Sequence, residues 1–368
     1  MRTPAPPVGL ALGFFALACG GSSDHPGAAP HDAAIVVDSP LADAPPAGDA
    51  AAPSPDAANP TAPATLADTG LCLDAACTQI TGAARAYAPR FPLWIDGATK
   101  RRWIALPPGT QIDTRDPDHW VFPVGTRFWK EITRDGVRVE TRYMIKRLAD
   151  DEADGAWFFV SFAWNASQDA TTPVTVGAQN VNGTPHDIPS VAECRACHDS
   201  LRPGHVLGFQ AIQLDFDGNL DALARLGWLS QPLPPAVGGA HYPLPADATP
   251  AQQAALGYFH ANCGHCHNPS SLVHATTPMV LRLDAAALAA GSSVTATPLY
   301  TTTTNATGLP LDENGATYTK IIVPRDPAHS ILNVRVNSTN PSHHMPKLGS
   351  ELTDPAASQH ALDWINAL

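Results

Sequence analysis

The chain has 368 residues, of which 34 are acidic and 22 are basic, so its formal net charge at pH 7 is −12. It contains no dense run of Lys and Arg, and this composition argues against nucleic acid as a partner. After an N-terminal stretch of low complexity, roughly three hundred residues remain, which is enough for two packed domains.

The N-terminus has the pattern of a bacterial export signal. Arg2 precedes an apolar run over residues 8–18, which is too short to span a bilayer permanently. Cys19 follows small residues at the end of this run, as in the bacterial lipobox, although Ala16 stands where Leu is usual. We therefore expect an exported protein that is lipidated at Cys19 and anchored to a bacterial membrane, facing the periplasm or the cell surface. A soluble secreted protein is the alternative.

Residues 20–65 are mostly Ala, Pro, Asp, Gly and Ser. Such a segment cannot bury enough apolar surface to offset the entropy of ordering it. We expect a disordered tether that lifts the folded part off the membrane, with an ordinary linker as the alternative.

Cys72 and Cys77 are close in sequence, whereas the other five cysteines belong to the lipobox or to C-x-x-C-H motifs. In an oxidising compartment such a spare pair predicts a small disulfide loop. Two unpaired buried thiols are the alternative.

Residues 66–182 have the pattern of an antiparallel β domain. Apolar and polar residues alternate over residues 128–132 and 137–143, and the sequence Arg-Asp-Gly between them predicts a hairpin turn. A further apolar and aromatic strand is predicted over residues 156–164. We expect a small sandwich or barrel without a catalytic triad or phosphate-binding loop.

Two C-x-x-C-H motifs lie at residues 194–198 and 263–267. Covalent attachment of haem requires two thiols that add to the vinyl groups of the porphyrin, and an adjacent imidazole that reaches the iron. Composition alone would produce on the order of 0.005 such pentapeptides, so two motifs predict two c-type haems. The predicted cofactor-binding residues are Cys194, Cys197, His198, Cys263, Cys266 and His267. The alternatives are a thioredoxin-like redox pair and a zinc ion held by both cysteine pairs.

The helices predicted around the second motif resemble those of class I cytochromes c. Residues 251–261 predict a helix that leads into Cys263. Phe259 lies four residues before that cysteine, where such cytochromes pack their first helix against their last. Residues 355–368 predict this last helix, because their apolar residues recur at helical spacing.

The loop before the last helix contains the sequence His-His-Met-Pro at residues 343–346. It resembles the loop that carries the distal ligand in class I cytochromes c, so Met345 is the predicted sixth ligand of the second haem. His343 and His344 are the alternatives. The stretch from residue 295 to residue 307 reads as an inserted polar loop.

The first motif is not flanked by such helices or followed by a Met-Pro loop. Prolines at positions 185 and 189 exclude a long helix before Cys194. A lone His is more often structural than a ligand, and an internal Met more often packs in a core. The sixth ligand of the first haem therefore stays open among His186, His205, Met144, Met279 and no residue at all.

Several segments resemble the bacterial dihaem c-type cytochrome family, in which a β region precedes two haem motifs. They are residues 91–98 (FPLWIDGA), 102–109 (RWIALPPG), 122–126 (FPVGT), 140–142 (ETR), 207–214 (LGFQAIQL), 261–263 (ANC), 345–346 (MP) and 364–365 (WI). The resemblance covers about residues 81–368. It implies haem binding and electron transfer. If the two haems relay electrons, the expected redox partners are a periplasmic dehydrogenase and a terminal acceptor.

We therefore expect an α+β multidomain protein, in which an N-terminal antiparallel β sandwich or barrel-like domain precedes a mainly α-helical, cytochrome c-like region. The expected segments are a signal peptide (1–19), a tether (20–65), a β domain (66–182), a first haem segment (183–245) and a cytochrome c-like domain (246–368).

The expected function is electron transfer by a dihaem c-type cytochrome that has no catalytic residues. One alternative is a dihaem enzyme of the peroxidase type with an open or labile first haem. Another is a β domain that docks a partner or a carbohydrate through exposed tryptophans. The tryptophans in question are Trp94, Trp103, Trp120 and Trp129.

Overall fold

The structure is a computed structural model that describes residues 62–199 and 205–368. The predicted signal peptide, the lipidation site Cys19 and nearly all of the predicted tether lie outside the described residues. Across the two described ranges, none of the helices has the length and apolar content that crossing a bilayer would need.

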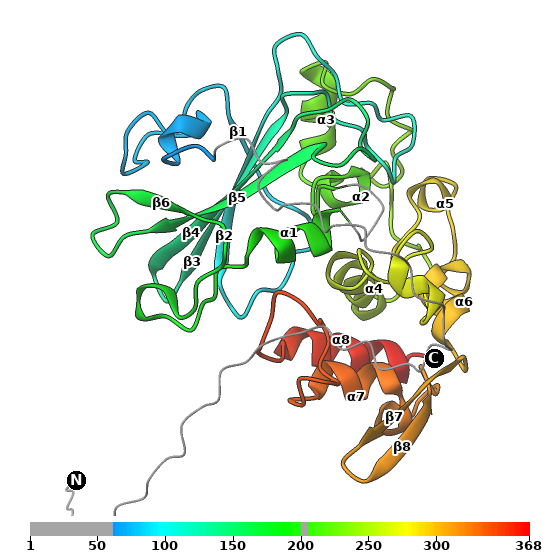
Figure 1. Cartoon of the computed structure of the whole chain (residues 1–368). Helices are drawn as coiled ribbons and strands as arrows, with labels where there is room; N and C mark the ends of the chain where they lie inside the picture. Colours follow the sequence, from blue (N-terminus) through cyan, green and yellow to red (C-terminus); the bar gives the residue numbers. More distant parts are fainter. Residues whose placement is uncertain (1–61, 200–204) are drawn as a thin grey trace, which may run out of the picture. The chain divides into compact units, whose positions relative to one another are not determined.

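The first part of the described chain forms one six-stranded sheet (Figure 1). Its strands are β1 (Arg85–Tyr87), β2 (Thr99–Ala105), β3 (Arg127–Arg134), β4 (Val137–Lys146), β5 (Trp157–Trp164) and β6 (Thr171–Val174). They lie in sequence order, and each pairs antiparallel with the next. The predicted hairpin is confirmed as β3 and β4, and Asp135 and Gly136 at its turn both have positive φ, which is typical of a type I′ turn.

The expected sandwich or barrel is wrong, because β1 and β6 are the two edges of an open sheet. Alternating apolar residues show that a strand buries a face but do not show what covers it. Here helices cover one face instead of a second sheet, so the fold is mixed α+β.

Eight α-helices follow the sheet in the described residues. They are α1 (Val191–His198), α2 (Ala211–Leu214), α3 (Asn219–Arg225), α4 (Pro250–Asn262), α5 (Ala285–Ala289), α6 (Pro298–Thr303), α7 (Ile331–Asn337) and α8 (Pro355–Asn366). A separate hairpin of β7 (Thr307–Glu313) and β8 (Ala316–Lys320) precedes α7 (Figure 1). Short 3₁₀ helices are η1 (Ala67–Thr69), η2 (Val181–Gly183), η3 (Leu272–Ala275), η4 (Val294–Ala296) and η5 (Pro327–His329).

The stretch predicted as a polar loop between residues 295 and 307 is largely helical. Thr297 caps α6 by accepting a hydrogen bond from the amide of Tyr300, and Pro298 occupies the first helical turn. Both features favour a helix start, and they override the low helix propensity of the threonines that follow.

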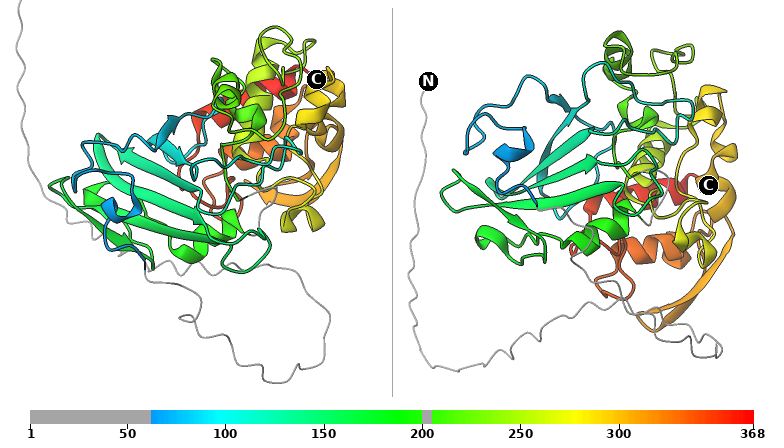
Figure 2. Two further views of the ribbon diagram at one scale, coloured as in Figure 1. Left: turned by 90° about the horizontal axis from the view of Figure 1, so that it is seen from above. Right: turned by 45° about the horizontal axis from the view of Figure 1, so that its top comes forward.

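A single hydrophobic cluster joins one face of the sheet to the helices. From the sheet it includes Ile104, Phe128 and Phe159, and from the helices it includes Phe259 and Trp364. The cluster contains residues from the expected β domain, the expected first haem segment and the expected cytochrome c-like domain, whose boundaries were placed near residues 182 and 245. Figure 2 shows the sheet and the helices from two further sides.

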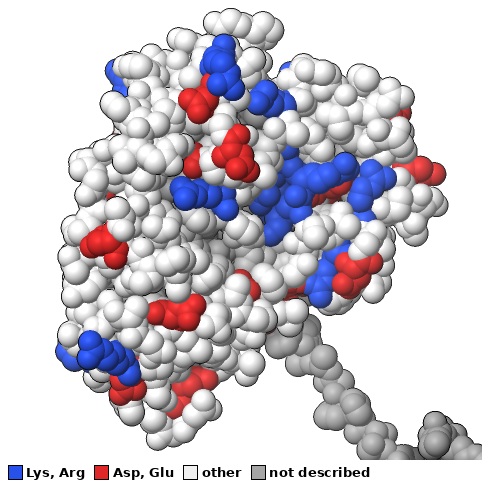
Figure 3. All heavy atoms as spheres, turned by 180° about the vertical axis from the view of Figure 1, so that it is seen from behind, with Lys and Arg blue, Asp and Glu red and all other residues white. Residues whose placement is uncertain are grey.

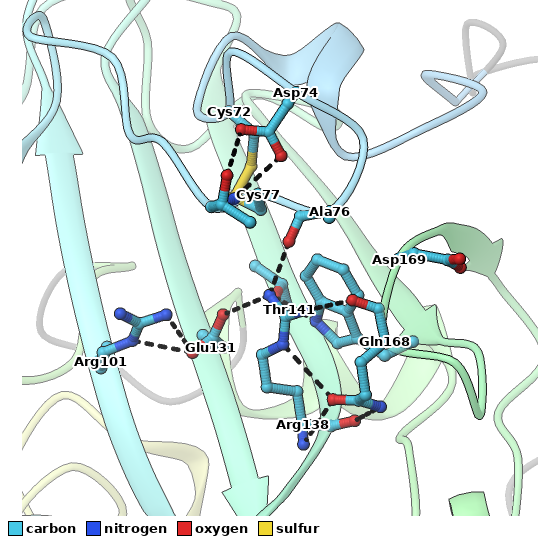
Figure 4. A network of polar contacts seen from close by, with 12 residues as sticks. Cys72, Asp74, Ala76, Cys77, Arg101, Glu131, Arg138, Thr141, Gln168 and Asp169 are labelled. Carbon is cyan, nitrogen blue, oxygen red and sulfur yellow. Dashed lines mark hydrogen bonds and ion pairs between the residues drawn. A yellow bond between two sulfur atoms is a disulfide. The ribbon is translucent and has the colours of Figure 1, made fainter.

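The opposite face of the sheet is covered by the loop that contains the two spare cysteines (Figure 4). Cys72 and Cys77 form a disulfide. Arg138 donates to the carbonyl oxygen of Ala76 at 2.9 Å, and its guanidinium carbon lies 3.6 Å from the centroid of the Trp164 ring. These contacts fix the disulfide loop to β4 and β5.

Helix α4 packs against the terminal helix α8, as the sequence predicted. Thr249 caps α4 with Gln252 in a capping box, and Pro250 stands in its first turn. Phe259 is completely buried, and the Tyr258 hydroxyl donates to Asp354 at the start of α8 over 2.7 Å. The interface therefore combines apolar burial with one directed hydrogen bond.

Candidate functional site

The first C-x-x-C-H motif lies within α1. Ser190 accepts a hydrogen bond from the Glu193 amide, and the Glu193 carboxylate accepts one from the Ser190 amide, so a capping box starts this short helix. Cys194 and Cys197 are three residues apart and His198 is four residues after Cys194, and such spacings share one helix face. The first motif therefore directs its two thiols and its imidazole to the same side.

Two contacts fix the orientation of the His198 ring. Its Nδ1 donates to the carbonyl oxygen of His205 over 2.5 Å, and its ring lies 5.3 Å from the ring of Phe159 in β5. Burial is the main cause that lowers the pKa of His198 to about 4. The imidazole is thus neutral at pH 7 and has its proton on Nδ1, which leaves Nε2 as the electron-pair donor.

The second motif begins where α4 ends. Cys263 is the C-terminal cap of α4, and the amides of Cys266 and His267 donate back to the Cys263 carbonyl at 3.1 and 2.8 Å. A Cβ at Gly264 would lie 2.6 Å from the His260 carbonyl oxygen and 2.8 Å from Cα of Arg282. Only glycine fits this close approach between two backbone segments.

All the groups of the second motif are desolvated. Burial is the main cause that raises the pKa of the Cys263 and Cys266 thiols to about 12. Burial also lowers the pKa of His265 and of His267 to about 4. These cysteines form no disulfide, so two neutral thiols and a neutral imidazole lie together.

The two motifs are neighbours in space although their last histidines are 69 positions apart in the sequence. Burial raises the pKa of the Cys266 thiol, and the charge of Cys197 in the first motif adds to this effect. Lys130 in β3 acts electrostatically on Cys194, Cys197 and His198, and also on His265 of the second motif. Both motifs therefore face one region of the sheet.

The loop that contains Met345 is held close to the second motif. The Met345 amide donates to the carbonyl of Arg335 in α7 over 3.2 Å. Burial lowers the pKa of His267, and the charges of His265 and Arg335 contribute to this effect. Arg335 thus links the Met345 backbone to the surroundings of His267.

The two alternative histidines are engaged elsewhere. His343 contacts the Glu313 carboxylate through Nδ1. His344 is buried, and its Nδ1 and Nε2 lie 3.0 Å from the Ser338 carbonyl oxygen and 3.4 Å from the Ser350 hydroxyl. These contacts favour Met345 over both neighbours as the residue available to a metal.

A strap formed by residues 90–96 connects β1 to both the second motif and the Met345 loop. The Trp94 amide donates to Asn262 Oδ1 at 2.6 Å, immediately before Cys263. The Asp96 carboxylate accepts hydrogen bonds from the amides of Glu351 and Leu352 at 3.0 and 2.9 Å. One segment therefore fixes both ends of the region in which a second haem would lie.

The two histidines that were candidates for the first haem have other partners. His186 is buried, and its Nε2 lies 2.9 Å from the carboxylate of Glu140, which is fully buried. The His205 ring stacks on Trp157, with 5.8 Å between centroids, and its backbone holds the Nδ1 side of His198. The backbone of His205 therefore lies on the Nδ1 side of the His198 ring, opposite Nε2.

The two methionines considered for the first haem belong to the core. Met144 is 9% exposed and pairs across the sheet with Phe128 and Phe159. Met279 is half-buried and packs against the same hydrophobic cluster. Their positions favour packing over ligation.

Sequence reasoning missed a group of charged residues on the face of the sheet beneath the motifs. Arg142 donates to Glu140 Oε1 over 2.6 Å. Burial raises the pKa of Glu140, but Arg142 and His186 outweigh this effect and hold its pKa at about 2. The only signal in the sequence was the placement of charges at alternate positions of predicted strands.

The observed donor set fits two covalently attached haems. Each motif supplies two cysteines without a disulfide partner among the described residues, together with a neutral imidazole, half-buried in His198 and buried in His267. Cys194, Cys197 and His198 would hold one group, and Cys263, Cys266 and His267 the other. In the part of the chain that the structure describes, no three His, Cys, Asp or Glu side chains converge as ligands of one metal ion, which is what the zinc alternative requires.

The tryptophans considered for carbohydrate stacking are mainly structural. Trp103, Trp120 and Trp129 are at most 6% exposed. Trp94 is half-buried and donates through Nε1 to the Leu352 carbonyl at 3.2 Å. The stacking surface that this alternative needs is therefore not formed by these rings.

Comparison with known proteins finds no matching family model, no similar curated protein and no similar solved structure.

Proposed function

We propose that this protein is a dihaem c-type cytochrome that transfers electrons in the periplasm or at the cell surface, anchored to a bacterial membrane through Cys19. The observation that carries the proposal is the convergence of two C-x-x-C-H motifs on one region of the sheet, with Cys197 close enough to Cys266 to affect its pKa. When bound, two such haems would supply one-electron chemistry at neighbouring centres. The protein would then accept electrons from a dehydrogenase and pass them to a terminal acceptor.

The residues of the chain would give the two centres different properties. His198 is oriented by the carbonyl of His205, and no sixth ligand is assigned to it. His267 follows α4, which packs against α8, and it lies near the Met345 loop. A thioether ligand favours reduced iron, so the second centre would have the higher reduction potential.

The test begins with the number of haems. The full chain is expressed with a c-type haem maturation system, and the pyridine haemochrome assay is expected to give two haems per chain. Joint substitution of Cys194 and Cys197 by Ala should leave one haem, as should joint substitution of Cys263 and Cys266. The matched control is joint substitution of Cys72 and Cys77, which removes a cysteine pair without removing a haem. Stoichiometric zinc and no haem in the wild-type chain would refute the proposal.

A peroxidase-type enzyme is the second candidate, because His186 Nε2 lies against Glu140 and the His205 ring stacks on Trp157, so neither is placed as a sixth ligand. An open sixth position at His198 would then receive peroxide. Magnetic circular dichroism and a peroxide turnover assay separate the two functions. High-spin iron together with turnover supports the enzyme, and two low-spin centres without turnover support the carrier.

A further inference from the structure

Three basic residues lie directly opposite one another on the face of the sheet beneath the motifs, and we refer to Arg102, Lys130 and Arg142 as the cation row. In the register of the sheet, Arg102 of β2 pairs with Lys130 of β3, and Lys130 pairs with Arg142 of β4. Like charges directly opposite across antiparallel strands destabilise a sheet unless counter-charges balance them. A row of this kind therefore needs anions.

The described residues supply only part of this balance. Glu140 pairs with Arg142, and a single carboxylate cannot neutralise three cations. Arg102 is 8% exposed, and among the described residues no hydrogen bond or ion pair satisfies it. Lys130 is half-buried and likewise has no bonded partner in residues 62–199 and 205–368. Arg102 and Lys130 therefore have no bonded counter-charge among the described residues, and Arg102 is buried.

Lys130 experiences this imbalance most strongly. Burial lowers its pKa well below the ordinary value, and Arg142, Arg102 and Lys100 lower it further. A nearby anion would reverse this effect by stabilising the ammonium form. The face drawn in Figure 3 shows that Lys and Arg also gather near the middle of one side of an otherwise acidic protein.

The position of the row identifies the anion. The His198 ring of the first motif lies 5.3 Å from the Phe159 ring in β5, and Arg142 pairs with Ser161, two residues further along that strand. Lys130 also acts electrostatically on the first motif and on His265 of the second. Any group attached to these cysteines would therefore lie next to the row. Haem carries two propionate carboxylates, and Arg and Lys are the side chains that bind carboxylates best.

We infer that the cation row of Arg102, Lys130 and Arg142 is a carboxylate site that binds haem propionates of the paired motifs, an inference that rests on the proposed function. The row would bind these carboxylates and keep them ionised. Arg102 and Lys130 provide the free donors, whereas Arg142 shares its charge with Glu140.

The test measures whether the propionates are held ionised. Carboxylates paired with cations have a lowered pKa, so both reduction potentials of the wild-type protein should be flat between about pH 5 and 8. In Arg102→Gln and Lys130→Met, one potential should fall as pH rises through this window. Lys130→Arg keeps the charge and should restore the flat profile. The other titratable or charged groups near the row are Tyr87, Lys100, Glu140, Cys194, Cys197, His198 and His265.

Arg101→Gln is the matched control. Arg101 precedes Arg102 on β2, but its side chain is 60% exposed and pairs with Glu131 at 2.8 Å. This variant removes the same charge from the same strand and should keep the flat profile. All three variants must hold two haems for this comparison. If the reduction potentials of Arg102→Gln and Lys130→Met depend on pH in the same way as those of Arg101→Gln, the inference is overturned and the proposed function stands.

Two further measurements complete the test. Infrared redox-difference spectra of the wild-type protein with ¹³C-labelled propionates should show ionised carboxylates down to about pH 5, and protonated ones would overturn the inference even if no variant folds. Calorimetric titration of the haem-loaded protein with oxalate should show no binding. Binding that is lost in Lys130→Met and kept in Arg101→Gln would assign the row to a free anion instead. A wild-type chain with fewer than two haems refutes the proposed function separately.

Discussion

Gly257→Ala provides a sharp test of how the strap is packed against the second motif. A Cβ at Gly257 in α4 would lie 2.5 Å from Cζ of Phe91 and closer still to Cε1 and Cδ1. Ordinary contact between carbon atoms is about 3.5 to 4.0 Å, so the ring must move by about an ångström or more. The backbone beside it cannot easily follow, because the Phe91 amide donates to Gln213 and the Pro92 carbonyl accepts from Asn262.

The size of the effect follows from two opposing contributions. Overpacking of this kind costs about 1 to 3 kcal/mol. Alanine in place of glycine within a helix returns about 1 kcal/mol through its higher helix propensity. We therefore expect Gly257→Ala to lower the free energy of unfolding by up to about 2 kcal/mol, and urea denaturation followed by circular dichroism measures this change.

The control is the same substitution in a Phe91→Ala background. There the ring is gone and only the helix propensity remains, so Gly257→Ala should stabilise the protein by up to about 1 kcal/mol. The sign of the effect should thus reverse between the two backgrounds. Equal effects in both backgrounds would refute the packing of Phe91 on α4.

Three further predictions concern the charged network and the loop. Glu140→Gln should lower the free energy of unfolding by about 1 to 3 kcal/mol at pH 7, because it leaves Arg142, whose side chain is 22% exposed, without its counter-charge. The pKa of Glu140 is about 2 in the folded protein, so its contribution to the free energy of unfolding is present above about pH 4.5 and is lost as pH falls towards 2. When unfolding is measured at decreasing pH, the stabilities of the variant and the wild type should therefore converge. Asp96→Ala should expose the amides at residues 351–352 to faster hydrogen exchange, with no change at α3. Met345→Ala should lower one reduction potential and leave the other unchanged in a potentiometric titration.

Local sequence signals predicted the parts of the fold that depend on neighbouring residues. Asp135 and Gly136 accept positive φ and so fix the β3 and β4 hairpin. Thr249 with Pro250 starts α4, and the apolar spacing after Pro355 defines α8. Local signals did not predict that helices cover one face of the sheet, because this packing depends on contacts between segments that are distant in the sequence.

In the candidate site, too, local features were predictable from the sequence and contacts between distant segments were not. The spacing of the cysteines identified both motifs, since attachment chemistry is encoded in five consecutive residues. The cation row was hidden, because it arises only when β2, β3 and β4 take a common register, which brings residues 102, 130 and 142 together. The partner of His186 was hidden for the same reason, because Glu140 lies 46 residues away.

The placement of His205 leads to a final prediction about the first haem. Its ring stacks on Trp157, and its backbone carbonyl accepts the Nδ1 proton of His198. His205→Phe keeps the carbonyl and an aromatic ring, so His198 should keep its orientation while the imidazole of residue 205 is lost. We expect two haems per chain and unchanged electron paramagnetic resonance signals from the first centre.

The matched variant is His186→Gln, which removes the other candidate imidazole and retains a hydrogen-bonding group opposite Glu140. If His205 were the sixth ligand, His205→Phe alone would convert a low-spin signal to a high-spin one. A change in His186→Gln alone would assign the ligand to His186, which would then have to leave Glu140 when haem binds. If neither variant changes the spectrum, the sixth position is open or is filled from another element.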